Sequence, residues 1–231
     1  MRFAFIVLTL AVGFIRAQSP AKFDVVSVRP SDPIVRGARM NIDASGSLTM
    51  LNQPLRNLIT YAYDLRAFQL SGAPGWIETD RFDVLAKSQD GPALAREKAR
   101  ALLAERFGLT VHHETKEQTV YLLTLAKGGS RMKVSADTGP QRGIYREGAG
   151  QAQGFAATTA MLAGMTDRAV IDKTGLTGKY DWTLEWSPDA EDVTRPSLFT
   201  ALPEQFGLKL ETGKGPVDVI VIDHINRPSQ N

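Results

Sequence analysis

Two stretches of the chain share one pattern, and this pattern restricts the fold more than any other feature. They read LLAERFGLTVHHETKEQTVYLLTLA (102–126) and ALPEQFGLKLETGKGPVDVIVIDHI (201–225). In each, a helical pattern ends at Phe-Gly-Leu, and we expect a strand, a polar turn and a second strand to follow. Gly108 and Gly207 stand where a helix closes in the left-handed conformation that glycine adopts without a side-chain clash. The repetition predicts helix-strand-strand units.

Two more diverged copies keep the same order, over residues 53–87 and 158–186. In the first of these, Leu55, Leu58, Ile59 and Ala62 recur at helical spacing. The predicted fold class is therefore α+β, with four repeated helix-strand-strand units forming small antiparallel sheets that carry helices on one face.

The segment AVIDKTGLTGKYD (169–181) reads as a hairpin inside the last-named copy. Gly175 and Gly178 bracket a loop in which positive φ is needed, and Asp172 is expected to bond backbone amides of its own turn. The alternative is a phosphate-accepting aspartate like that of P-type ATPases. Such a site needs a threonine where this chain has Leu176, and a parallel βαβ pattern, which the sequence lacks.

The ends and the middle of the chain suggest a domain plan. Residues 1–17 combine Arg2, an apolar run over 3–15 and small Ala17, as in a signal peptide, which predicts a periplasmic or secreted protein. Two α+β modules follow, over 18–134 and 155–231, joined by a Gly-rich linker at 135–154.

Charge and cysteine content exclude several functions. Removal of residues 1–17 takes away Arg2 and Arg16 and leaves 25 basic and 25 acidic residues. A nearly neutral chain without a cluster of basic and aromatic residues does not favour nucleic acid. Because the chain has no cysteine, disulfides, thiol nucleophiles and thiolate metal sites are excluded.

Three groups of residues could carry chemistry. His112 and Glu114 share one strand face and could bind an ion, but no third ligand is near in sequence, so neither metal nor cofactor is predicted. Ser130 and Lys133 have the Ser-x-x-Lys spacing of penicillin-recognising enzymes without the helix that this pair needs. Asp181 and Glu185 share a strand face, but four residues place them roughly 13 Å apart, beyond the reach of paired glycosidase carboxylates.

An aromatic stripe at Tyr180, Trp182 and Trp186 alternates along one strand. Such a stripe is either the buried face of a sheet or a platform for stacking sugars. We favour the buried face, because aromatic side chains remove a large apolar surface from water.

Several motifs together resemble one protein family. FDVVSVRPS, QLSGAPGWIETDRFDVLAK, LLAERFGLTVHHET, VIDKTGLTGKYDWTLEW and EQFGLKLETGKGPVDVIVIDHINRPS are similar to the exported soil-associated family of unknown function, expanded in Acidobacteria. The resemblance implies export, and in some relatives a place on BlaR1-like sensor peptidases, but no catalytic residue. Residues 102–123 also resemble the short N-terminal module of secretins and TonB-dependent transducers, which binds other proteins.

Together these observations predict an exported, non-enzymatic binding or sensory module. Its partner is expected to be an envelope protein or an extracellular peptide, which pairs with a free strand edge at Val26 or Val219. A secreted hydrolase of unrecognised type and a structural envelope protein are the alternatives.

Overall fold

The computed structural model describes residues 21–34, 36–137, 139–140, 142–146, 151–156, 158–162, 164–187 and 194–228. They form two compact units. The first contains the described residues of Met1–Asp64, Trp76–Gly108 and Asn226–Asn231, and the second those of Leu65–Gly75 and Leu109–Ile225. The predicted modules 18–134 and 155–231 have other limits than these units. The predicted leader 1–17 lies outside the described residues, as does part of the predicted linker 135–154.

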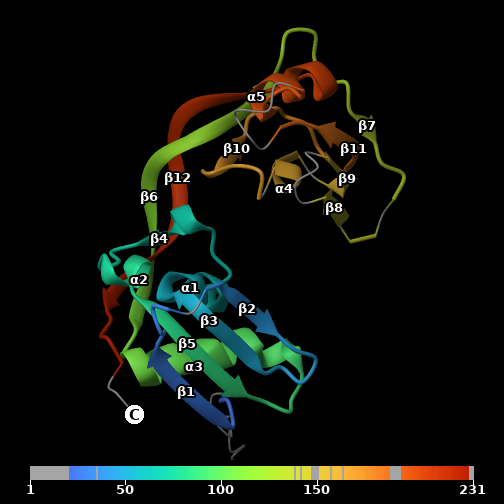
Figure 1. Cartoon of the computed structure of the whole chain (residues 1–231). Helices are drawn as coiled ribbons and strands as arrows, with labels where there is room; N and C mark the ends of the chain where they lie inside the picture. Colours follow the sequence, from blue (N-terminus) through green and yellow to red (C-terminus); the bar gives the residue numbers. More distant parts are fainter. Residues whose placement is uncertain are drawn as a thin grey trace, which may run out of the picture. The chain divides into compact units, whose positions relative to one another are not determined.

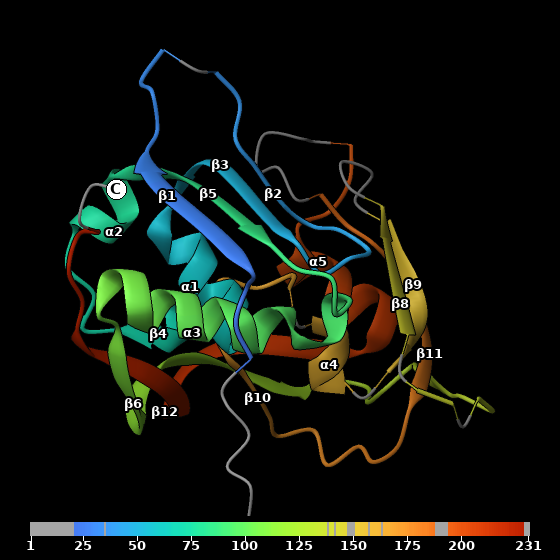
Figure 2. The ribbon, with the colours of Figure 1, turned by 90° about the horizontal axis from the view of Figure 1, so that it is seen from below.

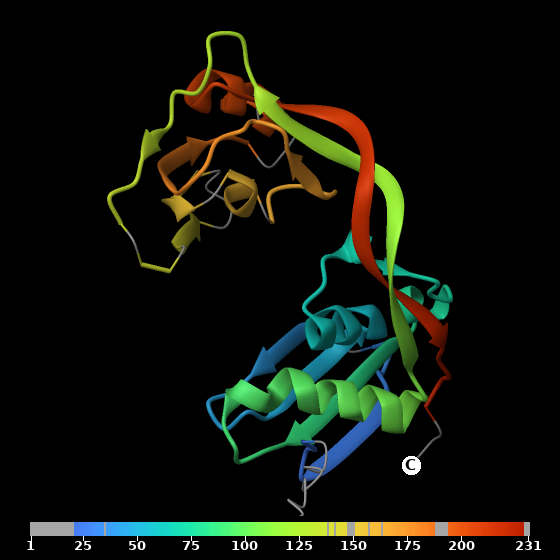
Figure 3. The same cartoon turned by 180° about the vertical axis from the view of Figure 1, so that it is seen from behind.

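The first unit is a four-stranded antiparallel sheet of order β1-β5-β3-β2, with helices on one face (Figures 1 and 3). Figure 1 has the strands in front, and Figure 3 has α1 and α3 in front. The elements are β1 (Val25–Pro30), β2 (Arg39–Ile42), β3 (Leu48–Pro54), α1 (Leu55–Tyr63), α2 (Trp76–Thr79), β5 (Arg81–Lys87), a 3-10 turn (Pro92–Leu94) and α3 (Ala95–Phe107).

The apolar faces read from the sequence form the core of this unit. The helical face of α1 is buried at Leu55, Leu58, Ile59 and Ala62, as predicted. The face of α3 that contacts the sheet includes Leu103 and Phe107, and β5 turns Phe82, Val84 and Ala86 toward the helices. Helix α3 ends at Gly108, whose φ is 60°.

The second unit contains two four-stranded sheets. One has the order β10-β6-β12-β4 and the other β7-β11-β9-β8. Its elements are a 3-10 turn (Ala67–Gln69), β4 (Leu70–Ser71), β6 (Thr110–Leu125), β7 (Lys133–Val134), β8 (Arg142–Arg146), β9 (Gln151–Ala156), α4 (Thr158–Leu162), β10 (Val170–Asp172), β11 (Tyr180–Glu185), α5 (Leu198–Ala201), a π-helical turn (Leu202–Phe206) and β12 (Leu208–His224). Mixed helices and antiparallel sheets confirm the α+β class.

The two strongest sequence copies do not fold as hairpins, so the repeated units are not confirmed. Residues Thr110–Leu125 form one 16-residue strand, and Leu208–His224 form one 17-residue strand. The two pair with each other in antiparallel register, with Gln118 opposite Gly215 and Glu117 opposite Pro216. The polar residues expected to form turns therefore lie in the middle of a long two-stranded ladder.

The hairpin predicted over 169–181 is also wrong in its pairing. β10 pairs in parallel with β6, whereas β11 pairs with β7 and β9. The turn between them joins two different sheets. Its Gly175 and Gly178 have φ of 71° and 97°.

The aromatic stripe is core at Tyr180 and Trp182, as predicted, whereas Trp186 follows the end of β11 and is only partly buried. Tyr180, Trp182 and Leu184 are buried, and Trp182 and Leu184 pack with Met161, Leu202 and Phe206. None of the helices in the described part of the chain has the length and apolarity needed to cross a bilayer.

Candidate functional site

The outermost strand of the first unit, β1, has a free hydrogen-bonding edge. It pairs with β5 alone, and the Ser31 amide donates to the Arg81 carbonyl at 2.9 Å. Along a strand of an antiparallel pair, the backbone amide and carbonyl groups of successive residues point alternately toward the partner strand and away from it. Ser31 points toward β5, so the amides and carbonyls of Val26 and Val28 point away from it. Within the described residues, no hydrogen bond reaches these groups.

A groove of about 230 Å³ lies beside this edge and is lined by residues at the start of β1 and along α3. Figure 2 shows where these two elements lie. Its apolar surface comes from Phe23, Val26, Ala101 and Leu102. Charged side chains complete the lining: Lys22, Asp24, Lys98, Glu105 and Arg106.

Opposite charges meet across the groove. The ammonium of Lys22 lies 3.0 Å from the Glu105 carboxylate, and both side chains are more than half exposed. Such an exposed pair is worth little in stability, so a ligand can separate it at small cost.

Lys98 is a buried cation at the base of the groove, and sequence reasoning missed it. Its side chain is only 1% exposed. The ammonium donates to the Ser88 hydroxyl at 2.7 Å and to the Asp90 carboxylate at 2.5 Å, and lies 5.9 Å from the centre of the Phe23 ring. Lys98 thereby fastens α3 to the end of β5 and supports Phe23. The available signal was its position among the apolar residues of α3, at the spacing of Ala95 and Leu102.

The second predicted edge, at Val219, is not free. β12 lies between β6 and β4, with Ile220 opposite Leu70 and Val221 opposite Ser71. The Val219 side chain is buried against Val120 and Val217. β4 is only two residues long, too short to show an alternating pattern, so the sequence did not reveal that it covers β12.

Asp172 accepts hydrogen bonds from its own turn and from α4. The Thr174 amide and hydroxyl donate at 2.7 and 2.6 Å, and the Thr158 hydroxyl donates to the other carboxylate oxygen. Partial burial raises the pKa of Asp172, but these bonds outweigh burial and leave its pKa below the ordinary value. Asp172 thus ties the turn to α4. The remaining predicted turn residue, Gly207, has φ of 64° and ends the π-helical turn.

The other groups considered for chemistry do not converge. Nδ1 of His112 lies 2.7 Å from an oxygen of Asp223, and Nε2 is 3.8 Å from Glu114. Across the described ranges, no three His, Asp or Glu side chains are placed to hold a metal ion. Ser130 accepts a bond from the Met132 amide just before the short strand β7, so it and Lys133 do not share a helix turn. Asp181 and Glu185 both lie on the exposed face of β11.

Comparison with known proteins places the chain in a family without indicating an activity. Searches among curated proteins and among solved structures give no match. A family described as "Protein of unknown function (DUF3738)" matches residues 56–225, a range that contains α3 but neither β1 nor the residues after Ile225. The chain belongs to this family of unknown function.

Proposed function

We propose that this chain is an exported, non-enzymatic binding module that recognises an extended segment of an envelope protein or extracellular peptide by adding it as a strand to β1. The observation that carries the proposal is the outward-facing backbone of Val26 and Val28, placed directly beside the groove between β1 and α3. Main-chain pairing supplies affinity in this mode, and side chains that enter neighbouring pockets supply selectivity.

The backbone geometry supports this mode of binding. Each outward amide or carbonyl that pairs with the partner exchanges a bond to water for one to protein, a net gain of about 0.5–1.5 kcal/mol. Natural proteins often blunt such edges with charges, bulges or proline. In β1, proline stands only at the last position, Pro30, and the two other residues whose backbone faces outward are valines.

The groove supports selectivity for apolar side chains. Alternate side chains of an added strand point to the same face as Val26 and Val28, which is the face covered by α3. There they meet Phe23 and Leu102, which are 8% and 4% exposed. The Lys22–Glu105 pair at the rim provides one charge of each sign for flanking polar residues of the partner.

We also propose that this chain acts outside the cytoplasmic membrane, in the envelope or in the medium. The signal-like residues 1–17 favour export, and the resemblance to the soil-associated family expanded in Acidobacteria suggests a role in the envelope, on its own or in the manner of domains on sensor peptidases. A partner in the periplasm or medium fits both.

The experiment is capture of partners from envelope extract by the chain with Val26→Pro and Val26→Thr as matched variants. Proline removes the outward amide, whereas threonine keeps it together with a β-branched side chain. We expect Val26→Pro to lose the captured partner and Val26→Thr to retain it, with both folded by circular dichroism. Equal capture by all three forms contradicts strand addition at β1.

A hydrolase screen on glycan, ester and peptide substrates tests the alternative. Turnover that disappears when a single acidic or histidine residue is changed, for example Asp181 or His112, would replace the binding proposal by an enzymatic one.

A further inference from the structure

A second cavity, of about 530 Å³, lies at the end of β1 farther from the groove; we call it the Pro30 cavity. Its size is within the range of cavities that hold small ligands or side chains. It is lined by Pro30, Ser31, Pro33, Asn52, Asp80, Arg81, Phe82, Arg227 and Pro228, all from the first unit.

The lining combines apolar surface with unused cationic donors. The guanidinium of Arg81 has no hydrogen bond or ion pair with any described residue. Arg227 uses Nε to bond Asp80 at 2.8 Å and stacks over Trp76, with 5.1 Å between the guanidinium carbon and the ring centre. Its two Nη groups make no hydrogen bond or ion pair within the described part of the chain. Three prolines and Phe82 form the apolar part, so the cavity suits an anion attached to an apolar group.

This cavity lies at the end of β1 and is lined from both faces of the sheet, because Ser31 and Arg81, opposite one another, point to the other side from Pro30 and Phe82. Pro30 is opposite Phe82 in the strand register, and its side chain points to the same side as those of Val26 and Val28. Pro30 has no amide hydrogen, so an added strand gains no donor from it beyond Val28. The Pro30 cavity therefore lies directly after the last residue of β1 that can donate a backbone hydrogen bond to an added strand.

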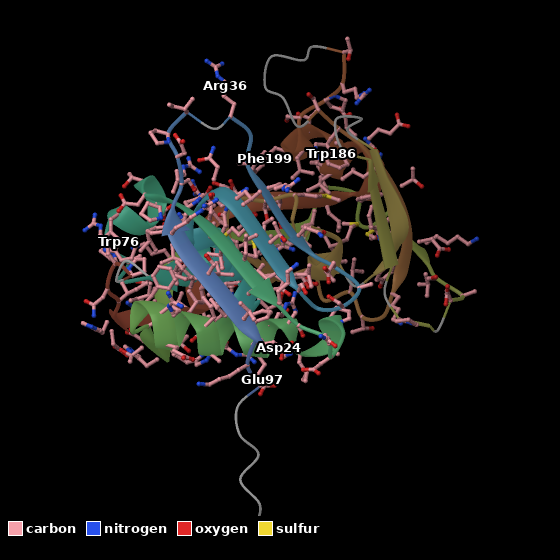
Figure 4. The ribbon with its side chains drawn as sticks, turned by 60° about the horizontal axis from the view of Figure 1, so that its bottom comes forward. Asp24, Arg36, Trp76, Glu97, Trp186 and Phe199 are labelled. Atoms are coloured by element: carbon pink, nitrogen blue, oxygen red, sulfur yellow. The ribbon has the colours of Figure 1, made fainter. Side chains whose placement is uncertain are left out.

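The two ends of β1 also differ in charge. Asp24, at its start, has a carboxylate with no side-chain partner among the described residues, whereas Arg81 stands at its end. Figure 4 shows Asp24 and Glu97 near the start of β1, and Trp76, which stacks under Arg227, near the other end. The start of β1 presents charges of both signs, since Asp24 and Glu105 lie beside Lys22 and Arg106, so it does not set a direction. A peptide lying along this edge is favoured with its negative end near Arg81, where the cation has no partner among the described residues.

We propose, building on strand addition at β1, that the partner peptide runs parallel to β1 and ends in the Pro30 cavity. Arg81 and Arg227 bind its C-terminal carboxylate, and Phe82 and the prolines contact its last, apolar side chain. The partner class is thereby narrowed to segments with a free, apolar C-terminus.

A minimal probe tests the cavity separately from the edge. N-acetyl-phenylalanine carries the carboxylate and an apolar side chain, and N-acetyl-phenylalanine amide lacks only the charge. In an NMR titration we expect the acid to shift the amide signals of residues 80–82 and 227, and the amide to bind at least ten times more weakly. Arg81→Gln should reduce binding of the acid to the level of the amide. Arg36→Gln, an exposed arginine outside the cavity lining, is the control and should change neither.

Peptides selected from a random heptapeptide library with free C-termini then link cavity and edge. Amidation of their C-termini should weaken binding at least tenfold in the native chain and have little effect in Arg81→Gln. Val26→Pro should weaken binding of the selected peptides but leave binding of N-acetyl-phenylalanine unchanged. If N-acetyl-phenylalanine and its amide bind with equal affinity, or if Arg81→Gln lowers both affinities equally, the proposal of a carboxylate site in the Pro30 cavity is overturned. Strand addition at β1 is not contradicted by that result. If the acid binds through Arg81 but Val26→Pro leaves peptide binding unchanged, strand addition fails and this proposal fails with it.

Discussion

The buried ammonium of Lys98 donates a 2.7 Å hydrogen bond to the hydroxyl of Ser88. The Ser88 amide in turn donates a hydrogen bond to the Ser47 hydroxyl at 3.1 Å, and that hydroxyl donates to the Ser88 carbonyl at 3.2 Å. A charge this deep is tolerated only when its donors are satisfied and an anion is near, and Asp90 supplies the anion. The base of the groove between β1 and α3 thus depends on a polar network.

The first prediction concerns this network. Asp90→Ala leaves the Lys98 charge without its counterion and should cost about 1–3 kcal/mol of unfolding free energy, discounted toward the lower end because the Asp90 side chain is 59% exposed. In a Lys98→Met background the same change should cost less than about 0.5 kcal/mol, since no buried charge is left to compensate. Urea denaturation of the four proteins gives the coupling. Equal costs in both backgrounds would show that Asp90 and Lys98 do not act together.

The second prediction concerns pH and Asp172. At pH values well above 3.8, its ordinary pKa, the carboxylate is ionised in both the folded and the unfolded chain. In that pH range its hydrogen bonds contribute fully to the stability of the folded chain. Because its pKa is lower in the folded chain, the unfolded chain takes up a proton first as the pH falls, and this contribution is lost between the ordinary and the lowered value. Asp172→Asn does not titrate. The stability difference between the native chain and Asp172→Asn should therefore be largest near pH 7 and shrink below about pH 4.

Urea unfolding from pH 7 to pH 3 measures this difference. Thr158→Val removes one of the donors to Asp172 and should reproduce part of the effect. A difference between the native chain and Asp172→Asn that stays constant over the whole range would contradict the assignment.

The third prediction compares two glycines with positive φ. A Cβ on Gly207 would lie 2.0 Å from the Gly129 carbonyl oxygen, whereas one on Gly178 would have no atom within 4 Å. Gly178→Ala should cost only the backbone strain, about 1–2 kcal/mol. Gly207→Ala adds a clash with backbone that cannot move aside and should cost clearly more. Thermal unfolding of the two variants decides this; equal melting temperatures would show that the 129–131 segment yields.

Local features were predictable from the sequence, and strand pairing was not. The face of α1 and the stripe around Trp182 follow from periodicity within one segment, because burial there repeats with the helical or strand period. A polar stretch such as Lys116–Thr119 looks the same locally in a turn and in an exposed part of a long strand. Only the partner strand, about 100 residues away, distinguishes the two.

For the candidate site too, some features could be predicted from the sequence and others depend on the fold. Sequence reasoning places Val26 at an edge because its strand lies near one end of the chain, but the same reasoning places Val219 at an edge, where β4 covers β12. The groove beside Val26 could not be predicted, since it depends on the packing of α3 against β1. The Pro30 cavity joins residues as distant in sequence as Ser31 and Arg227.

The last prediction tests whether β12 is one continuous strand. A Cβ on Gly215 would lie 2.3 Å from Cδ1 of Ile171, which covers this glycine from β10. Gly215→Ala should therefore cost about 1–3 kcal/mol through overpacking. Ile171→Val removes that methyl group and alone should cost about 0.5–1.5 kcal/mol. Combined with Gly215→Ala it should cost less than the sum of the two, because the added methyl fills the vacated space. If Gly215 instead lay in the turn of a local hairpin, it would not meet Ile171, and the two changes would be additive in urea denaturation.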